Sequence, residues 1–512
     1  MARRAAPFGV VIVAIALFDL RWHEFWRDEA NAMLEARAVP WGAFLEAMRV
    51  EGIPPLFHVL LKIAGAVLPN PLALVAVGAL DLGVLLFGTY RLLVALSGAP
   101  RAAARVTLAL SFTYVYAYEL GAVIRQYTLG LGLALLSFAY LRDALRLGDR
   151  RAVRAGALAA GLAALASAHS ACVAGGALLS FGLISLARRR SIRGWWPILL
   201  TLPAFALVVY LAAPYPGRTG EANLAQSYPP GVTLRLSLQA LVEGVMPHDW
   251  WHLEAFLPRR LADVVAALRS LAFWGVLTGA GVALAARILA LRGRWRTGAF
   301  EVIAVLGSLP PLLVIIVLHY WGFYRHHLFL GMPLLVVLAG WGLDAGLTGP
   351  IAGAARRLGL ALLAPWLLFQ AVLGAGSFAL DQRYPFSDTK AAARMLPPEA
   401  RLITDTHWRS TGVMFWRPDV QMRSAGWNGR RYRYIRPDQD WFRNVSIPPI
   451  VAEECRAAPD RVYFAGVAAS LGALGRCAGP VAYPKSPFET QPFTWETFDL
   501  FRMDCSCVTR GR

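Results

Sequence analysis

The sequence predicts an α-helical membrane protein that crosses the bilayer about eleven times and carries a C-terminal α/β domain. Of its 512 residues, 57% are apolar and only 16% are charged, whereas soluble domains contain about a quarter charged residues. Mean hydropathy is +0.48. Long apolar segments recur and are bounded by arginine clusters, and from about Leu380 onward the composition becomes polar. These observations favour a polytopic membrane part followed by a water-exposed domain.

The positive charge of the chain has a topological explanation. The net charge is +19, and the arginines fall mainly in short loops between apolar segments. Cytoplasmic loops of membrane proteins retain Lys and Arg in this way. No stretch combines a basic stripe with a soluble nucleic-acid-binding module. The pattern therefore predicts a membrane partner and no nucleic acid.

The first apolar segment, Phe8–Leu20, follows Arg3 and Arg4. Its length suits a signal peptide, but no small-x-small cleavage site follows it. With its flanks the segment covers Ala5–Trp22, which can just span a bilayer. We therefore expect a retained first helix and a cytoplasmic N-terminus.

Later spans follow when the arginine-rich loops are assigned to the cytoplasm. They are expected at Leu72–Leu92, Val106–Tyr118, Tyr127–Leu141, Ala155–Ala168, Ala171–Ala187, Trp196–Ala213, Leu271–Leu289, Phe300–His319, Leu328–Leu347 and Leu358–Phe378. The apolar stretch Pro54–Leu68 is expected to be juxtamembrane or re-entrant, because a crossing there would deliver Arg91, Arg101 and Arg105 to the outside. A short span at this place is the alternative. The C-terminus is then extracytoplasmic.

The C-terminal part alternates helical stretches with short β-rich runs at Ala400–Thr404, Arg461–Ala465 and Thr494–Met503. Four of the five cysteines lie in it, namely Cys455, Cys477, Cys505 and Cys507. Clustered cysteines on the outer side predict two disulfides in an oxidising compartment. Three pairings are open, and a bond between Cys505 and Cys507 is the least favoured because it would be strained.

Charged residues gather at the predicted outer face. Asp28 and Glu29 follow the first helix, Glu119 ends the third span, Arg125 and Tyr127 begin the fourth, and the late segment at 324–327 carries Arg325 and His326. Each has a structural alternative. The acids can begin a helix, and the arginines and tyrosines can contact lipid headgroups. Their collection at one face favours a functional site.

The order of these motifs resembles the GT-C glycosyltransferases, in the branch of protein O-mannosyltransferases and of lipid A aminoarabinose and galacturonic acid transferases. The matching residues are Trp26–Ala30 (Trp-Arg-Asp-Glu-Ala), Pro54–His58 (Pro-Pro-Leu-Phe-His), Arg125–Tyr127 and Tyr324–His326 with Met332–Pro333. The resemblance covers roughly residues 1–380. Two positions depart from the pattern: Ile53 replaces the Lys or His that often precedes the proline pair, and Tyr-Arg-His replaces an Arg-Tyr pair.

The resemblance implies the roles of the site residues. Asp28 would be the general base, and Glu29 and Glu119 would orient the acceptor or hold a metal. A divalent cation is used by some relatives and not by others, so Asp28, Glu29 and Glu119 are only candidate metal ligands. Arg125 and Arg325 would bind the donor phosphate, with Tyr127, His58 and His326 nearby.

The predicted function is an inverting glycosyltransferase that moves a sugar from a polyprenyl-phosphate donor to a hydroxyl of a lipid, glycan or protein acceptor. The alternatives are a transporter or flippase of lipid-linked sugars and a ligase or polymerase of surface polysaccharide. Residues 1–379 would form the catalytic transmembrane domain, including an outer loop at 21–71 with juxtamembrane helices. Residues 380–512 would form a periplasmic α/β domain. The arginine- and alanine-rich usage suggests a bacterium, so the inner membrane is the expected location, and a lipid or lipopolysaccharide acceptor is preferred.

Overall fold

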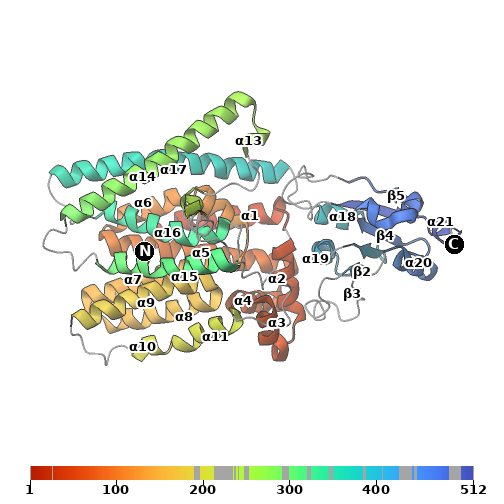
Figure 1. Ribbon diagram of the computed structural model, residues 1–512, viewed down its shortest axis with the longest axis horizontal. Helices are drawn as coiled ribbons and strands as arrows, with labels where there is room; N and C mark the ends of the chain where they lie inside the picture. The colour runs from red at the N-terminus through yellow and green to blue at the C-terminus, as the bar shows by residue number, and fades with distance from the viewer. Residues whose placement is uncertain are drawn as a thin grey trace. The chain divides into compact units, whose positions relative to one another are not determined.

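The computed structural model describes residues 2–25, 27–188, 196–212, 235, 238–239, 242–246, 253–290, 299–319, 324–344, 350–383, 388–405, 407–425, 441–442, 447–483 and 498–510. Its helices are α1 (Ala2–Arg21), α2 (Arg27–Ala38), η1 (Trp41–Ala43), α3 (Phe44–Glu51), α4 (Leu56–Val67), α5 (Asn70–Ser97), α6 (Pro100–Leu110), η2 (Tyr114–Ala122), α7 (Gln126–Leu147), α8 (Arg150–Ala166), α9 (Ala168–Ala187), α10 (Trp196–Leu199), α11 (Leu202–Ala212), α13 (Leu253–Phe256), α14 (Arg259–Ala290), α15 (Ala299–His319), α16 (Tyr324–Gly342), α17 (Pro350–Arg383), α18 (Thr389–Met395), α19 (His407–Trp416), α20 (Ile447–Ala457), η5 (Ala468–Cys477) and α21 (Cys505–Arg510) (Figure 1). Its strands are β1 (Arg401–Thr404), β2 (Gln421–Ala425), β3 (Trp441–Phe442), β4 (Val462–Gly466), β5 (Ala478–Pro480) and β6 (Asp499–Met503).

Residue contacts divide the chain into two units. The larger unit consists of Met1–Leu17, Gly52–Phe57 and Val77–Ala379, and the smaller unit consists of Phe18–Glu51, His58–Ala76 and Leu380–Arg512. Most of the outer loop predicted at 21–71 therefore has its contacts within the same unit as the C-terminal part. Each unit is described by itself.

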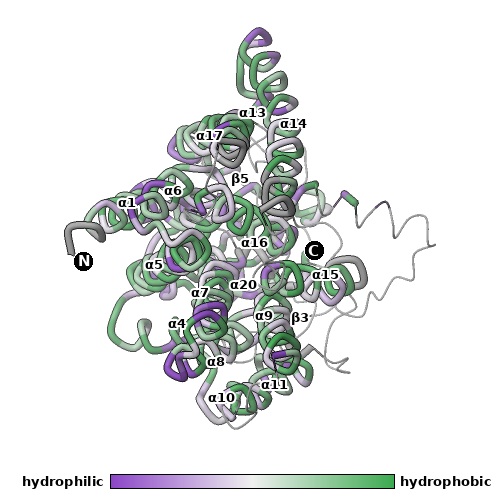
Figure 2. The backbone as a smooth tube through the Cα atoms, turned by 90° about the vertical axis from the view of Figure 1, so that its left-hand side faces the viewer, coloured by the Kyte–Doolittle hydropathy of each residue, from purple (hydrophilic) through white to green (hydrophobic). Residues whose placement is uncertain are grey.

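Apolar helices dominate the larger unit. Within the described residues, five helical segments are long and apolar enough to cross a membrane: Asn70–Ser97, Gln126–Leu147, Ala168–Ala187, Arg259–Val282 and Arg357–Arg383. Shorter apolar helices of this unit lie at Trp196–Leu211, Ala299–Ile315 and His326–Gly342, whereas most of the apolar helix Leu56–Val67 belongs to the smaller unit. Figure 2 shows the apolar residues along these helices. The order of eleven crossings stays a prediction.

Local capping explains where the central helices of the larger unit begin and end. Gly148 ends α7 in the left-handed conformation, with φ +70°, which glycine adopts at little cost. Asp149 then caps α8 by accepting a hydrogen bond from the Arg151 amide at 2.8 Å. Ser167 caps α9, since its hydroxyl accepts from the amides of His169 and Ser170. The result is a run of short connections that packs α7 against α8 and α9.

The third predicted span, Val106–Tyr118, was wrong as a continuous α-helix. Helix α6 ends at Leu110, and the π-helical segment η2 begins at Tyr114. The hydroxyls of Ser111 and Thr113 donate to the carbonyls of Leu108 and Leu110. Such local bonds compete with the helical pattern, and they separate α6 from η2.

The smaller unit contains a six-stranded sheet in the order β3-β2-β1-β4-β6-β5. Strands β1, β2, β3 and β4 pair in parallel, whereas β6 pairs antiparallel with β4 and β5. Register is given by pairs such as Ile403 opposite Phe464 and Ala465 opposite Leu500. Three of these strands lie within or next to the β-rich runs noted in the sequence.

Both faces of this sheet are covered. All five residues of β4 are buried, as expected of a strand with helices on each side. One core joins Ile403 and Phe464 to Val451 of α20. The other joins Leu402 and Ala465 to residues of α18 and α19. Side-chain alternation along β1 and β4 thus builds two cores from one sheet.

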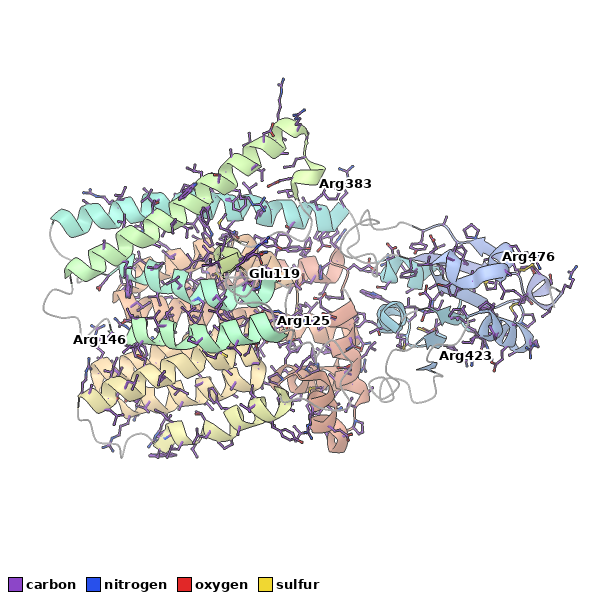
Figure 3. All side chains as sticks on the ribbon, in the orientation of Figure 1. Glu119, Arg125, Arg146, Arg383, Arg423 and Arg476 are labelled. Atoms are coloured by element: carbon purple, nitrogen blue, oxygen red, sulfur yellow. A yellow bond between two sulfur atoms is a disulfide. The ribbon has the colours of Figure 1, made fainter. Side chains whose placement is uncertain are left out.

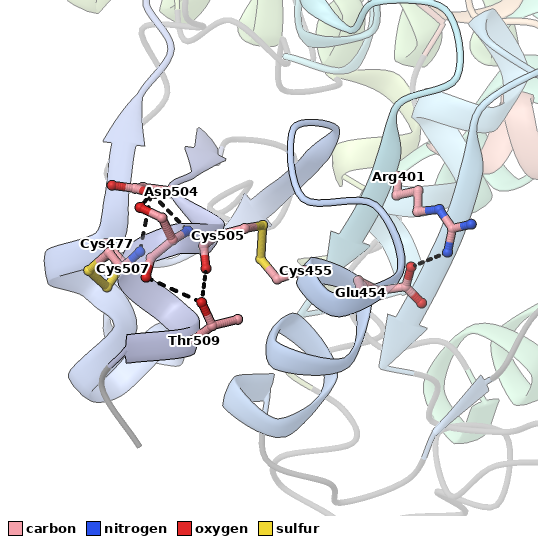
Figure 4. The surroundings of a disulfide bond; sticks show 9 residues. Arg401, Glu454, Cys455, Cys477, Asp504, Cys505, Cys507 and Thr509 are labelled. Carbon is pink, nitrogen blue, oxygen red and sulfur yellow. Dashed lines mark hydrogen bonds and ion pairs between the residues drawn. A yellow bond between two sulfur atoms is a disulfide. The ribbon is translucent and has the colours of Figure 1, made fainter.

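Two disulfides join the C-terminal helix α21 to α20 and to η5. Cys455 bonds Cys505, and Cys477 bonds Cys507 (Figure 4). The prediction of two disulfides is confirmed, and the pairing left open by the sequence is now assigned. By the chain-entropy relation, closing loops of 50 and 30 residues stabilises the fold by about 4 kcal/mol each.

Candidate active site

The acidic pair begins helix α2 in the smaller unit. Asp28 and Glu29 occupy its first turn, where the exposed amides and the helix dipole favour negative charge. Glu29 is fully buried and Asp28 is partly exposed. Of the two residues, Asp28 is therefore the one with exposed surface.

His23 links Glu29 to a distant acid. Its Nδ1 lies 2.6 Å from Oδ2 of Asp381, and its Nε2 lies 3.4 Å from Oε2 of Glu29. Burial alone would lower the pKa of His23, but Asp381 and Glu29 raise that pKa well above its usual value. An imidazolium has donors on both ring nitrogens, so it can serve both carboxylates at once.

Glu24 and Phe25, which follow His23, also contact the part of the chain beyond residue 380. Oε1 of Glu24 accepts a hydrogen bond of 2.5 Å from the backbone amide of Lys390. Burial raises the pKa of Glu24 to about 8, although the hydrogen bond and charge of Lys390 oppose this shift. The ring of Phe25 stacks on Trp416 with centroids 5.8 Å apart, and it meets Phe415 edge-on. The segment before α2 is thus held by three consecutive side chains.

His58 has an acidic neighbour in the smaller unit. Its Nε2 lies 4.0 Å from Oε2 of Glu35, and Glu35 also accepts a hydrogen bond of 2.8 Å from Asn31. Both His58 and Glu35 are buried. His58 therefore packs beside an acidic residue of α2.

Glu119 belongs to the larger unit and lies in η2. It is buried, and the hydroxyl of Tyr114 donates toward its Oε2 at 3.5 Å. Tyr114 stacks on Tyr118, and Tyr118 meets Phe378 edge-on. The π-helical segment η2 ends at Ala122, three residues before Arg125.

Arg125, Tyr127 and His326 come together in the larger unit. The hydroxyl of Tyr127 lies 2.8 Å from Nε2 of His326. The guanidinium carbon of Arg125 lies 5.8 Å from the ring centroid of Tyr127, within reach of a cation–π interaction. Figure 3 labels Glu119 of η2 and Arg125, the extended residue that precedes α7. Arg325 is the second residue of α16, and its side chain lies outside the described residues.

Two more histidines extend this group. His169, at the start of α9, stacks on His326 with ring centroids 4.6 Å apart and an angle of 5° between the planes. Nδ1 of His327 lies 2.7 Å from Oε2 of Glu243. All three histidines are buried. Arg125, Tyr127, His169, His326 and His327 are called the histidine cluster below.

The described residues contain no group of three or more His, Cys, Asp or Glu side chains arranged to hold a metal ion. Among the candidate ligands, Asp28 and Glu29 belong to the smaller unit and Glu119 to the larger. A role for these carboxylates as metal ligands stays a prediction.

Comparison with known proteins gives a fold and no sequence family. No protein-family model matches the chain, and no curated protein matches it. Among solved structures, ArnT from Cupriavidus metallidurans bound to undecaprenyl phosphate matches 97% of this chain and 98% of its own, with 15% identity and a TM-score of 0.56. The apo state of the same protein matches over the same shares with a TM-score of 0.52. The chain has the GT-C fold.

The GT-C fold confirms the resemblance noted in the sequence at the level of architecture. The structural match covers nearly the whole chain, so the similarity includes the part beyond residue 380 as well as the membrane helices. With its apolar helices, the GT-C fold makes this a multi-pass membrane protein.

The sequence-predicted site residues fall into two groups within the GT-C fold. Asp28, Glu29 and His58 belong to the smaller unit. Glu119, Arg125, Tyr127, Arg325 and His326 belong to the larger unit.

Sequence patterns did not single out His23, Asp381 and Glu243, whereas His327 lies in the late segment at 324–327 that was noted in the sequence. His23 lies six residues before Glu29, so its closeness to the acidic pair was a usable signal. Asp381 is 358 residues from His23, and nothing in local spacing connects the two.

Proposed function

We propose that this protein is an inverting glycosyltransferase that uses a polyprenyl-phosphate-linked sugar as donor. The observation that carries the proposal is the acidic start of α2, where Asp28 is partly exposed beside the buried Glu29–His23–Asp381 arrangement. The GT-C fold supports the proposal, since one protein with that fold has been solved with undecaprenyl phosphate bound.

The chemistry requires one base. An acceptor hydroxyl must lose its proton as it attacks the anomeric carbon, and one carboxylate suits that task in a displacement that inverts the centre. We assign this role to Asp28. Glycosidases need a second carboxyl group to protonate the leaving group. A polyprenyl phosphate leaves as a stabilised anion, so no second acid is needed.

The departing phosphate requires cationic and hydrogen-bonding groups. Arg125, Tyr127 and His326 are assigned to it, together with Arg325. Guanidinium groups match phosphate geometry, and the Tyr127–His326 bond of 2.8 Å holds two of these side chains together. Glu29 and Glu119 are assigned to orienting the acceptor, or to a divalent cation if one is used. His58 is a weaker candidate for the phosphate because Glu35 lies beside it.

The proposed cellular location follows from the predicted membrane topology. We propose eleven crossings of a bacterial inner membrane, a cytoplasmic N-terminus, and a periplasmic α/β domain over residues 380–512. Its two disulfides support an oxidising compartment. The acceptor is proposed to be a lipid or lipopolysaccharide hydroxyl, with a protein hydroxyl as the alternative.

The test is release of polyprenyl phosphate by the purified protein from a panel of lipid-linked pentoses and hexoses, with bacterial membrane lipids as acceptors. Asp28→Asn is the informative variant, and Glu46→Gln in the first turn of α3 is its matched control. Acceptor-dependent release that is lost in Asp28→Asn and kept in Glu46→Gln would support the proposal. Donor binding without release from any donor would replace the transferase with a carrier.

A further inference from the structure

We infer that His23 is a positioning residue, which fixes the Glu29 carboxylate and the first turn of α2 against Asp381. The inference rests on the proposed function, because it assigns His23 an effect on the reaction of Asp28. His23 itself is buried, with 2% exposure. It therefore acts through Glu29 and does not contact substrate.

Contacts before α2 support this role. His23, Glu24 and Phe25 bind Asp381, Lys390 and the Phe415–Trp416 pair, respectively. His23 also contacts α2. Its Nε2 lies 3.4 Å from Glu29, which has no exposed surface. The orientation of the first turn is thus tied to a residue near the end of α17.

The charges around His23 explain why an imidazole suits this position. Glu29 faces it from α2 and Asp381 faces it from α17. Asp19 of α1 is buried within electrostatic range of it, and Glu24 follows it in the chain. Buried carboxylates repel one another unless a cation or donor separates them. His23 is placed between two of them and holds both.

Displacing a reacting group by about 1 Å can cost about 100-fold in rate. A carboxylate at the start of α2 is subject to this effect, since Asp28 is adjacent to Glu29 in the same turn. Loss of the His23–Glu29 contact should consequently lower kcat and leave the KM for the donor unchanged. A residue needed only for folding would instead reduce the amount of folded protein.

Two variants separate the effects of the two His23 contacts, one to Asp381 and one to Glu29. The amide nitrogen of asparagine can replace Nδ1, so His23→Asn keeps the bond to Asp381 and loses Glu29. The amide of glutamine can replace Nε2, so His23→Gln keeps Glu29 and loses Asp381. We expect kcat per folded molecule to fall about 100-fold in His23→Asn and by about tenfold in His23→Gln. Glu24→Gln is the matched control, because it removes a neighbouring buried carboxyl group, keeps an oxygen that can accept from the Lys390 amide, and should keep the wild-type kcat.

The experiment measures kcat, donor KM and melting temperature for the full-length wild-type protein and these three variants. Wild-type kcat in both His23 variants would overturn the inference, as would a larger loss in Gln than in Asn. A similar kcat loss in Glu24→Gln would also overturn it, since the effect would then follow from changing any buried polar side chain of this segment. Absence of any release by the wild-type protein would instead overturn the proposed function and the inference with it.

Discussion

Oε1 of Glu24 lies 2.5 Å from the backbone nitrogen of Lys390, and the two residues are 366 positions apart. Glu24 follows the first helix, whereas Lys390 lies in α18. Thr389 of the same helix also contacts Glu24, with its hydroxyl 3.5 Å from Oε1. The segment after the first helix is therefore anchored to the backbone of the C-terminal part through the buried carboxyl group of Glu24.

This anchor predicts loss of stability with rising pH. Burial raises the pKa of Glu24 from 4.5 to about 8, so between these values the unfolded chain releases a proton that the folded protein retains. Stability from this group is full below pH 4.5 and is lost as pH rises through 8. At about 1.4 kcal/mol per pKa unit, the loss is at most on the order of 5 kcal/mol.

Melting temperatures across this pH range check the prediction. Glu24→Gln keeps an oxygen that can accept from the Lys390 amide and cannot ionise. We expect the melting temperature of the variant to rise relative to wild type as pH increases from 4.5 to 8. Parallel curves for the two proteins would show that Glu24 does not titrate in this way.

Features that depend on local sequence were predictable. Hydropathy located the segments that became α5, α7 and α9, because burial in lipid requires long apolar helices whatever their neighbours are. The acidic start of α2 was also visible, since Asp28 and Glu29 are adjacent. Cysteine clustering predicted two disulfides, but their pairing depends on how α20, η5 and α21 pack.

Features that depend on distant contacts were not predictable. His23 contacts Asp381 although 358 positions separate them, and no periodicity in the sequence predicts that contact. The change from α6 to η2 was missed because Ser111 and Thr113 have no glycine or proline beside them to mark a break. Their hydroxyls bond to nearby carbonyls instead, and only the structure shows that choice.

The histidine cluster predicts graded losses of donor affinity. Tyr127→Phe removes the hydroxyl that lies 2.8 Å from His326. A hydrogen bond of this kind contributes about 1 kcal/mol, so the donor KM should rise by about fivefold. Arg125→Gln removes a charge, for which about 1.5–3 kcal/mol is typical, and should raise the donor KM by at least tenfold.

Donor titrations with the purified variants test this gradation. Tyr140→Phe is the matched control, because Tyr140 lies in the same helix α7 and contacts Arg91. An unchanged donor KM in Arg125→Gln would remove Arg125 from the phosphate site. An equal rise in Tyr140→Phe would indicate a general disturbance of α7.

The two disulfides predict a simple thiol count. The chain has five cysteines, and Cys455–Cys505 and Cys477–Cys507 leave only Cys172 free. Alkylation of the denatured, unreduced protein should therefore label Cys172 alone, as read by peptide mass spectrometry. Labelling of Cys455 or Cys477 before reduction would contradict the pairing.

Close contact between α5 and α7 predicts that Gly132 tolerates no side chain. A Cβ on Gly132 would lie 2.6 Å from the backbone nitrogen of Leu85, and a Cβ on Gly88 would lie 2.3 Å from the carbonyl oxygen of Gly132. These contacts involve backbone atoms, so relief requires the two helices to separate. Overpacking of this kind costs about 1–3 kcal/mol, and Gly132→Ala should lower the melting temperature accordingly.

Gly281→Ala is the control, since its Cβ would meet nothing within 4 Å and alanine favours a helix by about 1 kcal/mol over glycine. Because α7 also carries Tyr127, Gly132→Ala should weaken donor binding as well. Equal melting temperatures for the two variants would show that α5 and α7 lie farther apart than these contacts require.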